Sequence, residues 1–383
     1  MALLLLAFAA KTFYFIWSNL QIGNIWFNDF LAIFDCCRFP IGHLASEIYD
    51  RSVLDAYQDA LAAPHHYPCP YPPSFLLLMA PIGWIDFYWS YAFWMLATFA
   101  FYLAVSWCRG SARPASFLLL VAPATVATFS FGQTGFLTST LMVGGCRFLG
   151  SRPILSGIFF GLLSIKPQLG VLVPIALVSA RSWMTLAAAG TTVLALVFAS
   201  SAAFGWSMWS LWLAQLLTHA DWAATGQAHQ MPTIIANLTF VGLDLPVARV
   251  IQIAVAIVVA GIIWACFHRG PTNLASSALL VGTFLATPYA FVYDMPMVTN
   301  AILAVIRDDK QRHRRMSMPE ALILLSLLFL PVVMMETWRP RAARSIPLIL
   351  MFGLILWRIF GNRLGNARPE TTAGIRQEEM GQI

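Results

Sequence analysis

Long apolar stretches alternate with short polar segments along nearly the whole chain. A helix that crosses the hydrocarbon core of a membrane needs roughly 20 mostly apolar residues, and several stretches approach this length. The pattern therefore predicts a bundle of about 10–12 transmembrane helices. We expect spans near 1–20, 87–107, 115–131, 134–149, 183–204, 247–267, 273–290, 295–306, 318–336 and 346–361.

The segment 153–180 has a different pattern. Its two apolar stretches, 154–165 and 169–178, are each too short to cross a membrane. They meet at Lys166-Pro167, where proline breaks a helix. Basic residues stand at both outer ends of the pair. A hairpin of two short helices that returns to the same side fits this pattern best, and its non-helical centre must line protein or water.

Composition agrees with a membrane protein. Hydrophobic residues make up 59% of the 383 residues, charged residues only 10%, and the mean hydropathy is +0.72. Soluble domains have about 45–50% apolar and about 25% charged residues. The sequence predicts an all-α polytopic membrane protein. We expect one transmembrane domain over 1–365 and a polar cytoplasmic tail over 366–383.

The net charge of +6 could indicate a nucleic-acid partner, but the positions of the charges argue against one. The densest basic cluster, at 310–315, lies in a short loop between two apolar stretches. Short basic loops mark the cytoplasmic side of membrane proteins. Most basic loops fall on this side when the predicted spans are counted. A bacterial cytoplasmic (inner) membrane is the expected location.

One basic loop breaks this rule. Arg339, Arg341 and Arg344 fall on the outer side by the same count. Either one span is miscounted, or these arginines form a site for an anionic lipid head group. Both explanations stay open from the sequence, and Arg339 and Arg341 are candidate ligand-binding residues under the second.

Three segments are expected on the outer side. The first loop, 21–86, carries most of the acidic residues, and its part 47–62 has the pattern of an amphipathic helix on the membrane surface. The second loop, 205–245, opens with a tryptophan-rich helix suited to the interface. The third is the tip at 289–294. Because the inner loops are small, any chemistry is expected at the outer face.

Cysteine and histidine give no metal pattern. The six cysteines form no CxxC, and the histidines are not spaced for zinc, so no metal or cofactor is expected. Cys36, Cys37 and Cys69 share the first outer loop. In an oxidising compartment Cys69 can pair with either neighbour. Three free thiols are the alternative.

An enzyme at the outer face would have no nucleotide there, and the chain has no P-loop and no GxGxxG. Its substrate must then be delivered by the membrane, as a polyprenyl-phosphate sugar is. A series of short motifs occurs in the chain in this order: Asn28-Asp29-Phe30, Tyr71-Pro72-Pro73-Ser74-Phe75, Ala80-Pro81, Gly132-Gln133, Lys166-Pro167, Gln230, and Pro288-Tyr289 through Tyr293-Asp294.

This ordered set, over roughly residues 1–310, resembles glycosyltransferase family 87. Those are GT-C-fold enzymes that include polyprenyl-phosphomannose-dependent α-1,2-mannosyltransferases. The chain departs from the family pattern at 229–232, where His-Gln-Met-Pro replaces an Asn-Gln-Ser type of run. It departs again at Phe34 and Asp35, where tyrosines often follow the early Asp-Phe. Both departures bear on the identity of the substrate.

Asp29 is the predicted catalytic base. An inverting transfer needs a base that takes the proton of the acceptor hydroxyl, and a partly desolvated carboxylate can have its pKa raised towards that role. The resemblance gives the Asp of the early Asp-Phe motif the same role. An ordinary loop carboxylate is the alternative. Asp35 is the second candidate, for which a structural role is the better interpretation.

Lys166 is the one cation deep in the predicted hairpin, where a charge is costly and needs a partner. It could contact the phosphate of the donor, or it could form a salt bridge with Asp294. Tyr71 could stack on a sugar, although the prolines after it favour a structural role. The remaining candidates for hydrogen bonds to substrate are Gln133, His229, Gln230 and Asp294.

The sequence thus predicts an inverting, metal-independent glycosyltransferase. Its donor would be a polyprenyl-phosphate hexose, for which mannose is one candidate, and its acceptor a lipid-linked or envelope glycan. A secondary transporter or lipid flippase is the main alternative, because it too would have many spans and a broken helix. Transporters usually have paired broken helices, however, and the sequence shows one clear break. A non-catalytic membrane scaffold is the third interpretation.

Overall fold

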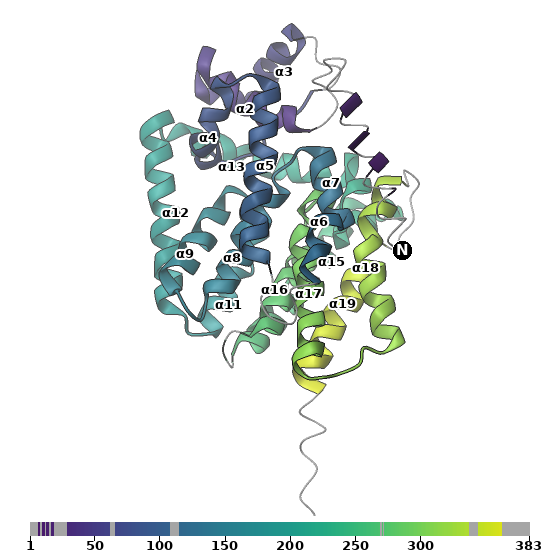
Figure 1. The fold of residues 1–383 in the computed structure, drawn as a ribbon. Helices are drawn as coiled ribbons and strands as arrows, with labels where there is room; N and C mark the ends of the chain where they lie inside the picture. Colours follow the sequence, from purple (N-terminus) through teal and green to yellow (C-terminus); the bar gives the residue numbers. More distant parts are fainter. Residues whose placement is uncertain are drawn as a thin grey trace, which may run out of the picture.

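The computed structural model describes residues 29–61, 66–107, 115–268, 270, 272–336 and 344–361, together with a few positions among the first 18. These residues form helices and connecting loops and include no strand (Figure 1). The predicted all-α fold is confirmed. The expected span 1–20 lies largely outside the described residues, and the expected tail 366–383 lies entirely outside them.

Four described helices are long and apolar enough to cross a membrane. They are α5 (Phe87–Ser106), α12 (Trp183–Phe204), α15 (Leu245–Phe267) and α18 (Met318–Glu336), each at a predicted span. The other predicted spans are shorter helices: α6 (Leu118–Val121), α7 (Pro123–Phe131), α8 (Gly135–Phe148), α16 (Asn273–Ala286), α17 (Pro296–Gln311) and α19 (Ile346–Leu356). Proline explains one division, because α6 ends at Val121, Ala122 is extended, and Pro123 begins α7.

The predicted hairpin at 153–180 is present. Its first arm is α9 (Pro153–Leu162), followed by the short 3-10 helix η5 (Leu163–Ile165). Lys166 has a non-helical backbone, and α10 (Pro167–Gly170) and α11 (Val173–Ser179) form the second arm. Figure 1 shows α9 and α11 at the same end of the bundle, where α12 begins. The proline therefore breaks the helix where the sequence analysis expected.

The first arm packs unusually close to α12. A Cβ atom at Gly157 would lie 2.5 Å from Ala188, and one at Gly161 would lie 2.5 Å from the Cβ of Thr192. Two glycines four residues apart let helix backbones approach closely inside a membrane, where packing rather than hydrophobicity drives association. This contact fixes the position of the break at Lys166 along α12.

Two segments form a cap at the upper end of the bundle in Figure 1. The first contains α2 (Phe30–Gly42), η2 (Ala45–Tyr49), α3 (Arg51–Ala60), α4 (Pro73–Met79) and η3 (Ala80–Trp84). The second contains α13 (Ser207–Gly226), η6 (Ala228–Gln230) and α14 (Ile234–Phe240). We call this end the cap end.

The surface helix expected at 47–62 is α3, and it is amphipathic as predicted. Asp50 caps it by accepting a hydrogen bond from the backbone N–H of Ser52 at 2.9 Å. Its apolar face, however, packs on protein. Leu54 is buried, and the ring of Tyr57 meets that of Phe39 in α2 edge to face. The helix thus covers α2, which the sequence analysis did not identify as a helix.

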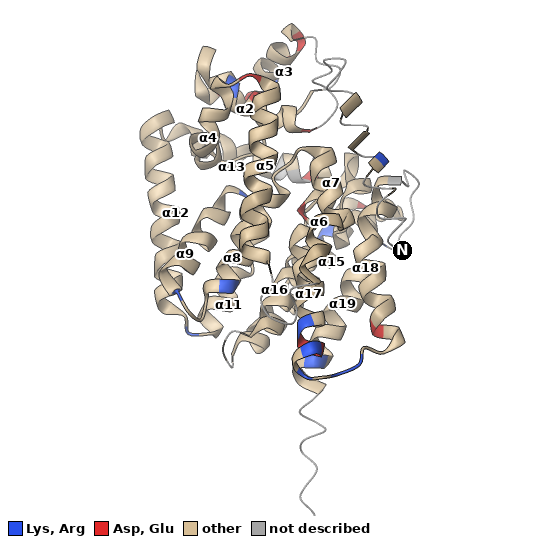
Figure 2. Ribbon diagram, in the orientation of Figure 1, with Lys and Arg blue, Asp and Glu red and all other residues tan. Residues whose placement is uncertain are grey.

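The opposite end carries most of the basic residues (Figure 2). We call it the basic end. There the π-helical turn η8 (Trp357–Gly361) buries Arg358, whose guanidinium lies 2.9 Å from both Asp309 and Glu320. Arg314 reaches Glu320 at 2.6 Å. This buried ion network holds the ends of α17, α18 and α19 together, and Arg314 of the predicted basic cluster is part of it.

We expect Gly161→Ala to destabilise the protein by about 1–3 kcal/mol, because the added methyl group has no room against Thr192. Gly190→Ala is the matched control. Gly190 lies in the middle of α12 with open space around its Cβ position, so alanine there should be neutral or slightly stabilising. Thermal unfolding in detergent measures both. Equal melting temperatures for the two variants would contradict the close contact.

Candidate active site

A cavity of about 460 Å³ lies between the cap and the break in the hairpin. Its wall is formed by the start of α2, the extended segment 66–71, the α9–α10 break, the residues around η6, and the segment that leads into η7 (Val292–Asp294). Five of the predicted site residues line it: Asp29, Tyr71, Gln133, Lys166 and Gln230. The fold thus brings residues from distant parts of the chain to one place.

Asp29 stands directly before α2 and is partly buried. Its backbone carbonyl accepts the first hydrogen bond of the helix, from Ala32 at 3.1 Å. Its carboxylate makes no capping bond to the helix. Burial raises the pKa of the Asp29 carboxyl to about 7. A carboxyl group with this pKa can gain and lose a proton near neutral pH, as a general base must.

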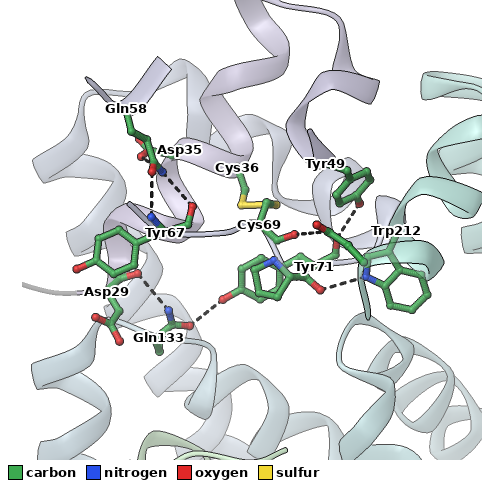
Figure 3. The surroundings of a disulfide bond; sticks show 12 residues. Asp29, Asp35, Cys36, Tyr49, Gln58, Tyr67, Cys69, Tyr71, Gln133 and Trp212 are labelled. Carbon is green, nitrogen blue, oxygen red and sulfur yellow. Dashed lines mark hydrogen bonds between the residues drawn. A yellow bond between two sulfur atoms is a disulfide. The ribbon is translucent and has the colours of Figure 1, made fainter. Parts of the chain in front are cut away.

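Gln133 holds Asp29 from below (Figure 3). Its amide nitrogen donates to the backbone carbonyl of Asp29 at 3.1 Å, and its amide oxygen accepts from the Tyr71 hydroxyl at 2.8 Å. Gly132, before it, ends α7 with a φ of +66°, a conformation that glycine adopts without strain. The Gly132-Gln133 motif therefore turns the chain and aims the amide at Asp29. Both candidate substrate ligands, Gln133 and Tyr71, are occupied by this chain of hydrogen bonds.

Lys166 forms the buried salt bridge that the sequence analysis weighed as one of its alternatives. Its Nζ lies 2.7 Å and 2.8 Å from the two carboxylate oxygens of Asp294, which is fully buried. It also lies 4.9 Å from the centre of the Tyr293 ring. Asp294 accepts a further hydrogen bond from the backbone N–H of Phe291 at 3.1 Å. Lys166 lines the cavity, whereas Asp294 lies behind it.

A disulfide ties α2 to the cavity wall (Figure 3). Cys36 pairs with Cys69, with Cα atoms 5.9 Å apart, and Cys37 is a buried free thiol. Of the two pairings left open by the sequence, the structure forms this one. The bond closes a loop of 33 residues and joins the helix that Asp29 precedes to the segment that carries Tyr71.

Asp35 does not line the cavity. Its carboxylate accepts a hydrogen bond from Gln58 in α3 at 3.2 Å, and burial raises its pKa to about 7. The same amide side chain donates to the backbone carbonyl of Tyr67 at 3.2 Å and accepts from its N–H at 2.9 Å. Asp35 thus helps to hold Gln58, which in turn binds the backbone of Tyr67 in the cavity wall. This agrees with the structural interpretation of Asp35.

The second cap segment forms another wall of the cavity and is bonded to the segment 66–71. Trp212 donates to the carbonyl of Pro70 at 3.1 Å, and Gln215 donates to that of Cys69 at 2.8 Å. The tryptophan-rich helix predicted for the interface therefore has two faces. Trp206 and Leu213 are exposed, as an interfacial helix requires, while Trp212 is buried against the first cap segment.

The sequence analysis missed His219, which lines the cavity from α13. Its Nε2 lies 2.6 Å from the hydroxyl of Tyr289. Burial, with smaller effects of Arg51 and Lys166, lowers the pKa of His219 to about 4, so the imidazole is neutral at pH 7. A pair made of a neutral imidazole and a phenol can donate and accept hydrogen bonds to sugar hydroxyls. No sequence motif distinguished this histidine from the others.

Three predicted ligands lie away from the cavity or outside the described residues. His229 does not line the cavity, and its backbone carbonyl accepts a hydrogen bond from Arg344. The backbone N–H of Arg344 also donates a hydrogen bond to the side-chain oxygen of Asn237 at 3.0 Å. The arginine therefore lies against the second cap segment. Arg339 and Arg341 lie outside the described residues.

The comparisons with known proteins agree with this geometry. The family profile described as glycosyltransferase family 87 matches residues 70–288, more than half of the 383-residue chain. No curated protein and no solved structure matches the chain significantly. The matched region contains Tyr71, Gln133, Lys166, His219 and Gln230, all of which line the cavity. The chain belongs to glycosyltransferase family 87 and is a membrane glycosyltransferase.

Proposed function

We propose that the protein transfers a hexose, with inversion, from a polyprenyl-phosphate donor to a hydroxyl of a lipid-linked or envelope glycan. The observation that carries this proposal is that Asp29 and Lys166 line one cavity. Catalysis of group transfer requires the base and the group that stabilises the leaving phosphate to face the same bound substrate. The bacterial inner membrane, with the cap end outside, is the proposed setting.

In the proposed reaction, the acceptor oxygen attacks the anomeric carbon of the donor. The new C–O bond forms on one face of the sugar while the bond to the phosphate oxygen breaks on the other, which inverts the anomeric centre. The electron pair of the broken bond leaves with the polyprenyl phosphate. The proton of the acceptor hydroxyl passes to the Asp29 carboxylate.

Lys166 is proposed to hold the donor phosphate from the cavity side. The salt bridge to Asp294 keeps the ammonium group charged in a buried position and directs it by two short contacts. The charge is then in place before the donor binds, as electrostatic stabilisation of a leaving group requires. His219, Tyr289 and Gln230 line the same cavity and are proposed to bind sugar hydroxyls.

The orientation is supported by the charges. Lys and Arg gather at the basic end (Figure 2), which the positive-inside rule places in the cytoplasm. The cap end, with the cavity and the disulfide, then faces the outside, where disulfides persist. Membership of a glycosyltransferase family favours an enzyme over the transporter, flippase and scaffold interpretations.

We expect Asp29→Asn to fold and insert normally but to lower the transfer rate by about 10²–10⁴-fold, the usual contribution of a general base. The assay follows release of polyprenyl phosphate from a panel of polyprenyl-phosphate hexoses, with a lipid extract as the source of acceptor. Asp35→Asn is the matched control, because Asp35 is in the same segment but does not line the cavity. Full activity of Asp29→Asn would reject the base.

The rate should also depend on pH. Because Asp29 must be ionised to accept a proton and its pKa is about 7, kcat/KM should rise with pH through about 7 and then level off. The pKa of Asp35 is also about 7, so the Asp35→Asn variant decides which carboxyl group is responsible. The acidic limb should persist in that variant. Its disappearance would assign the limb to Asp35 instead.

Lys166→Ala alone would leave Asp294 buried without its partner, which destabilises proteins by about 3–5 kcal/mol. We therefore expect the double variant Lys166→Ala with Asp294→Asn to regain most of this stability. Its KM for the donor should still rise about 10-fold or more, since a charged hydrogen bond to the phosphate is lost. Recovery of normal donor KM in the double variant would show that Lys166 is only the partner of Asp294.

A further inference from the structure

The segment 66–71 forms one wall of the cavity at Asp29. Five of its six residues line that cavity. The hydroxyl of Tyr71 is already hydrogen-bonded to an amide side chain of the protein. The other two lining residues of this wall with polar side chains are His66 and Tyr67. The proposed transfer gives neither of them a role.

Tyr67 is held by its backbone, while its side chain lines the cavity. The Gln58 amide donates to the Tyr67 carbonyl at 3.2 Å and accepts from the Tyr67 N–H at 2.9 Å. Within the described part of the chain, the Tyr67 hydroxyl makes no hydrogen bond and the ring meets no other aromatic ring. A ring fixed in this way can carry the apolar face of a sugar, and its hydroxyl can bind a sugar hydroxyl.

Tyr67 also lies next to the proposed base. Figure 3 shows its ring beside Asp29. Burial, with smaller effects of the Asp29 and Asp35 charges, raises the pKa of Tyr67 to about 12, so the phenol keeps its proton at neutral pH. A base must touch the hydroxyl that it deprotonates. The acceptor therefore lies against Asp29 and reaches Tyr67 as well.

His66 continues the same wall to the surface of the cap. Its Nε2 lies 2.8 Å from a carboxylate oxygen of Asp59, and its backbone carbonyl accepts a hydrogen bond from Arg51 at 3.4 Å. The side chains of His66 and Asp59 are 34% and 67% exposed, so both reach water. The wall thus runs from Asp29 to solvent, and its outer end carries an imidazole and a carboxylate, groups that bind hydroxyls.

We propose that this wall is the acceptor site and that the acceptor is a glycan of at least two sugars. The terminal sugar lies on Tyr67 with its reacting hydroxyl at Asp29, and the next sugar binds the pair of His66 and Asp59. A hydroxyl borne directly on a lipid would have no use for this polar outer end, which suits a second sugar. The inference rests on the proposed function, because it takes Asp29 as the base.

The test measures the binding of soluble glycosides to the full-length protein in nanodiscs by saturation-transfer difference NMR. The probes are methyl glycosides of glucose, galactose and mannose, and methyl glycosides of disaccharides built from these sugars. We expect at least one disaccharide to bind about tenfold more tightly than the monosaccharide that forms its non-reducing end, the effect of one charged hydrogen bond.

Two variants separate the inner and outer parts of the wall. Tyr67→Ala should weaken monosaccharide and disaccharide binding about tenfold, because both lose the ring, whereas Tyr67→Phe should keep most of the affinity. His66→Ala should weaken the disaccharide about tenfold and leave the monosaccharide unchanged. A purely structural role of His66 would not distinguish the two probes.

Tyr88→Ala and His43→Ala are the matched controls. Tyr88 is partly buried and His43 is exposed, as Tyr67 and His66 are, but neither lines the cavity, so both variants should bind like the unmodified protein. The proposal is overturned if no glycoside binds, or if disaccharides bind no more tightly than monosaccharides. It is equally overturned if Tyr67→Ala and His66→Ala bind like the controls.

Binding of these probes needs neither donor nor turnover, so its failure is distinct from a failure of the proposed transfer. Glycoside binding without release of polyprenyl phosphate would reject the transfer and keep the glycan site. Where transfer occurs, Tyr67→Ala should raise the KM for the acceptor in a lipid extract and leave the KM for the donor unchanged. A rise in the donor KM alone would overturn the assignment of this wall to the acceptor.

Discussion

The salt bridge between Lys166 and Asp294 connects the two parts of the chain on which the cavity depends. Lys166 interrupts the hairpin between α9 and α10, and Asp294 ends the turn before α17. A charge at this depth is tolerated only with a partner, so each residue requires the other. The hairpin break and the turn at 288–294 must therefore meet, and the floor of the cavity lies where they do. The glycine contact of α9 with α12 sets the position of the break relative to the bundle.

The cap depends on a second set of constraints. Asp29 lies before α2, a short helix with only 13 residues, and nothing in that helix alone would hold the carboxyl group over the floor. The disulfide between Cys36 and Cys69, the Gln58 amide, and the chain from Tyr71 through Gln133 to the Asp29 carbonyl supply the missing rigidity. Buried polar groups that satisfy one another in this way fix a single arrangement. Most of these polar groups thus hold the cap segments in place. The carboxylate of Asp29, in contrast, makes no hydrogen bond to the start of α2.

The two ends of the bundle use charge differently. At the cap end, a few charges are buried and paired next to a cavity that belongs to a glycosyltransferase. At the basic end, Arg358, Asp309, Glu320 and Arg314 form a network that joins helix ends. The basic residues on which the proposed orientation depends therefore also link helix ends.

The sequence by itself determined the features that follow from local chemistry. Apolar length gave the membrane class and most helices, proline placed the break at Lys166, and the ordered motifs indicated the family that the profile match establishes. Asp29 and Lys166 could be singled out because a carboxylate and a cation beside apolar segments are costly without a purpose.

Only the tertiary structure decided which polar residues face the cavity. It chose Cys36 over Cys37 for the disulfide, turned Asp35 and His229 away from the cavity, and brought in His219 from α13. It also showed that Gln133 and Tyr71 bind each other, and that Arg307 belongs to a helix face rather than to a loop. These outcomes depend on contacts between segments that are up to 200 residues apart, as in the bond from Tyr102 to the carbonyl of Pro296, 194 residues on. Local propensity carries no information about such contacts, because they are set by how the helices pack.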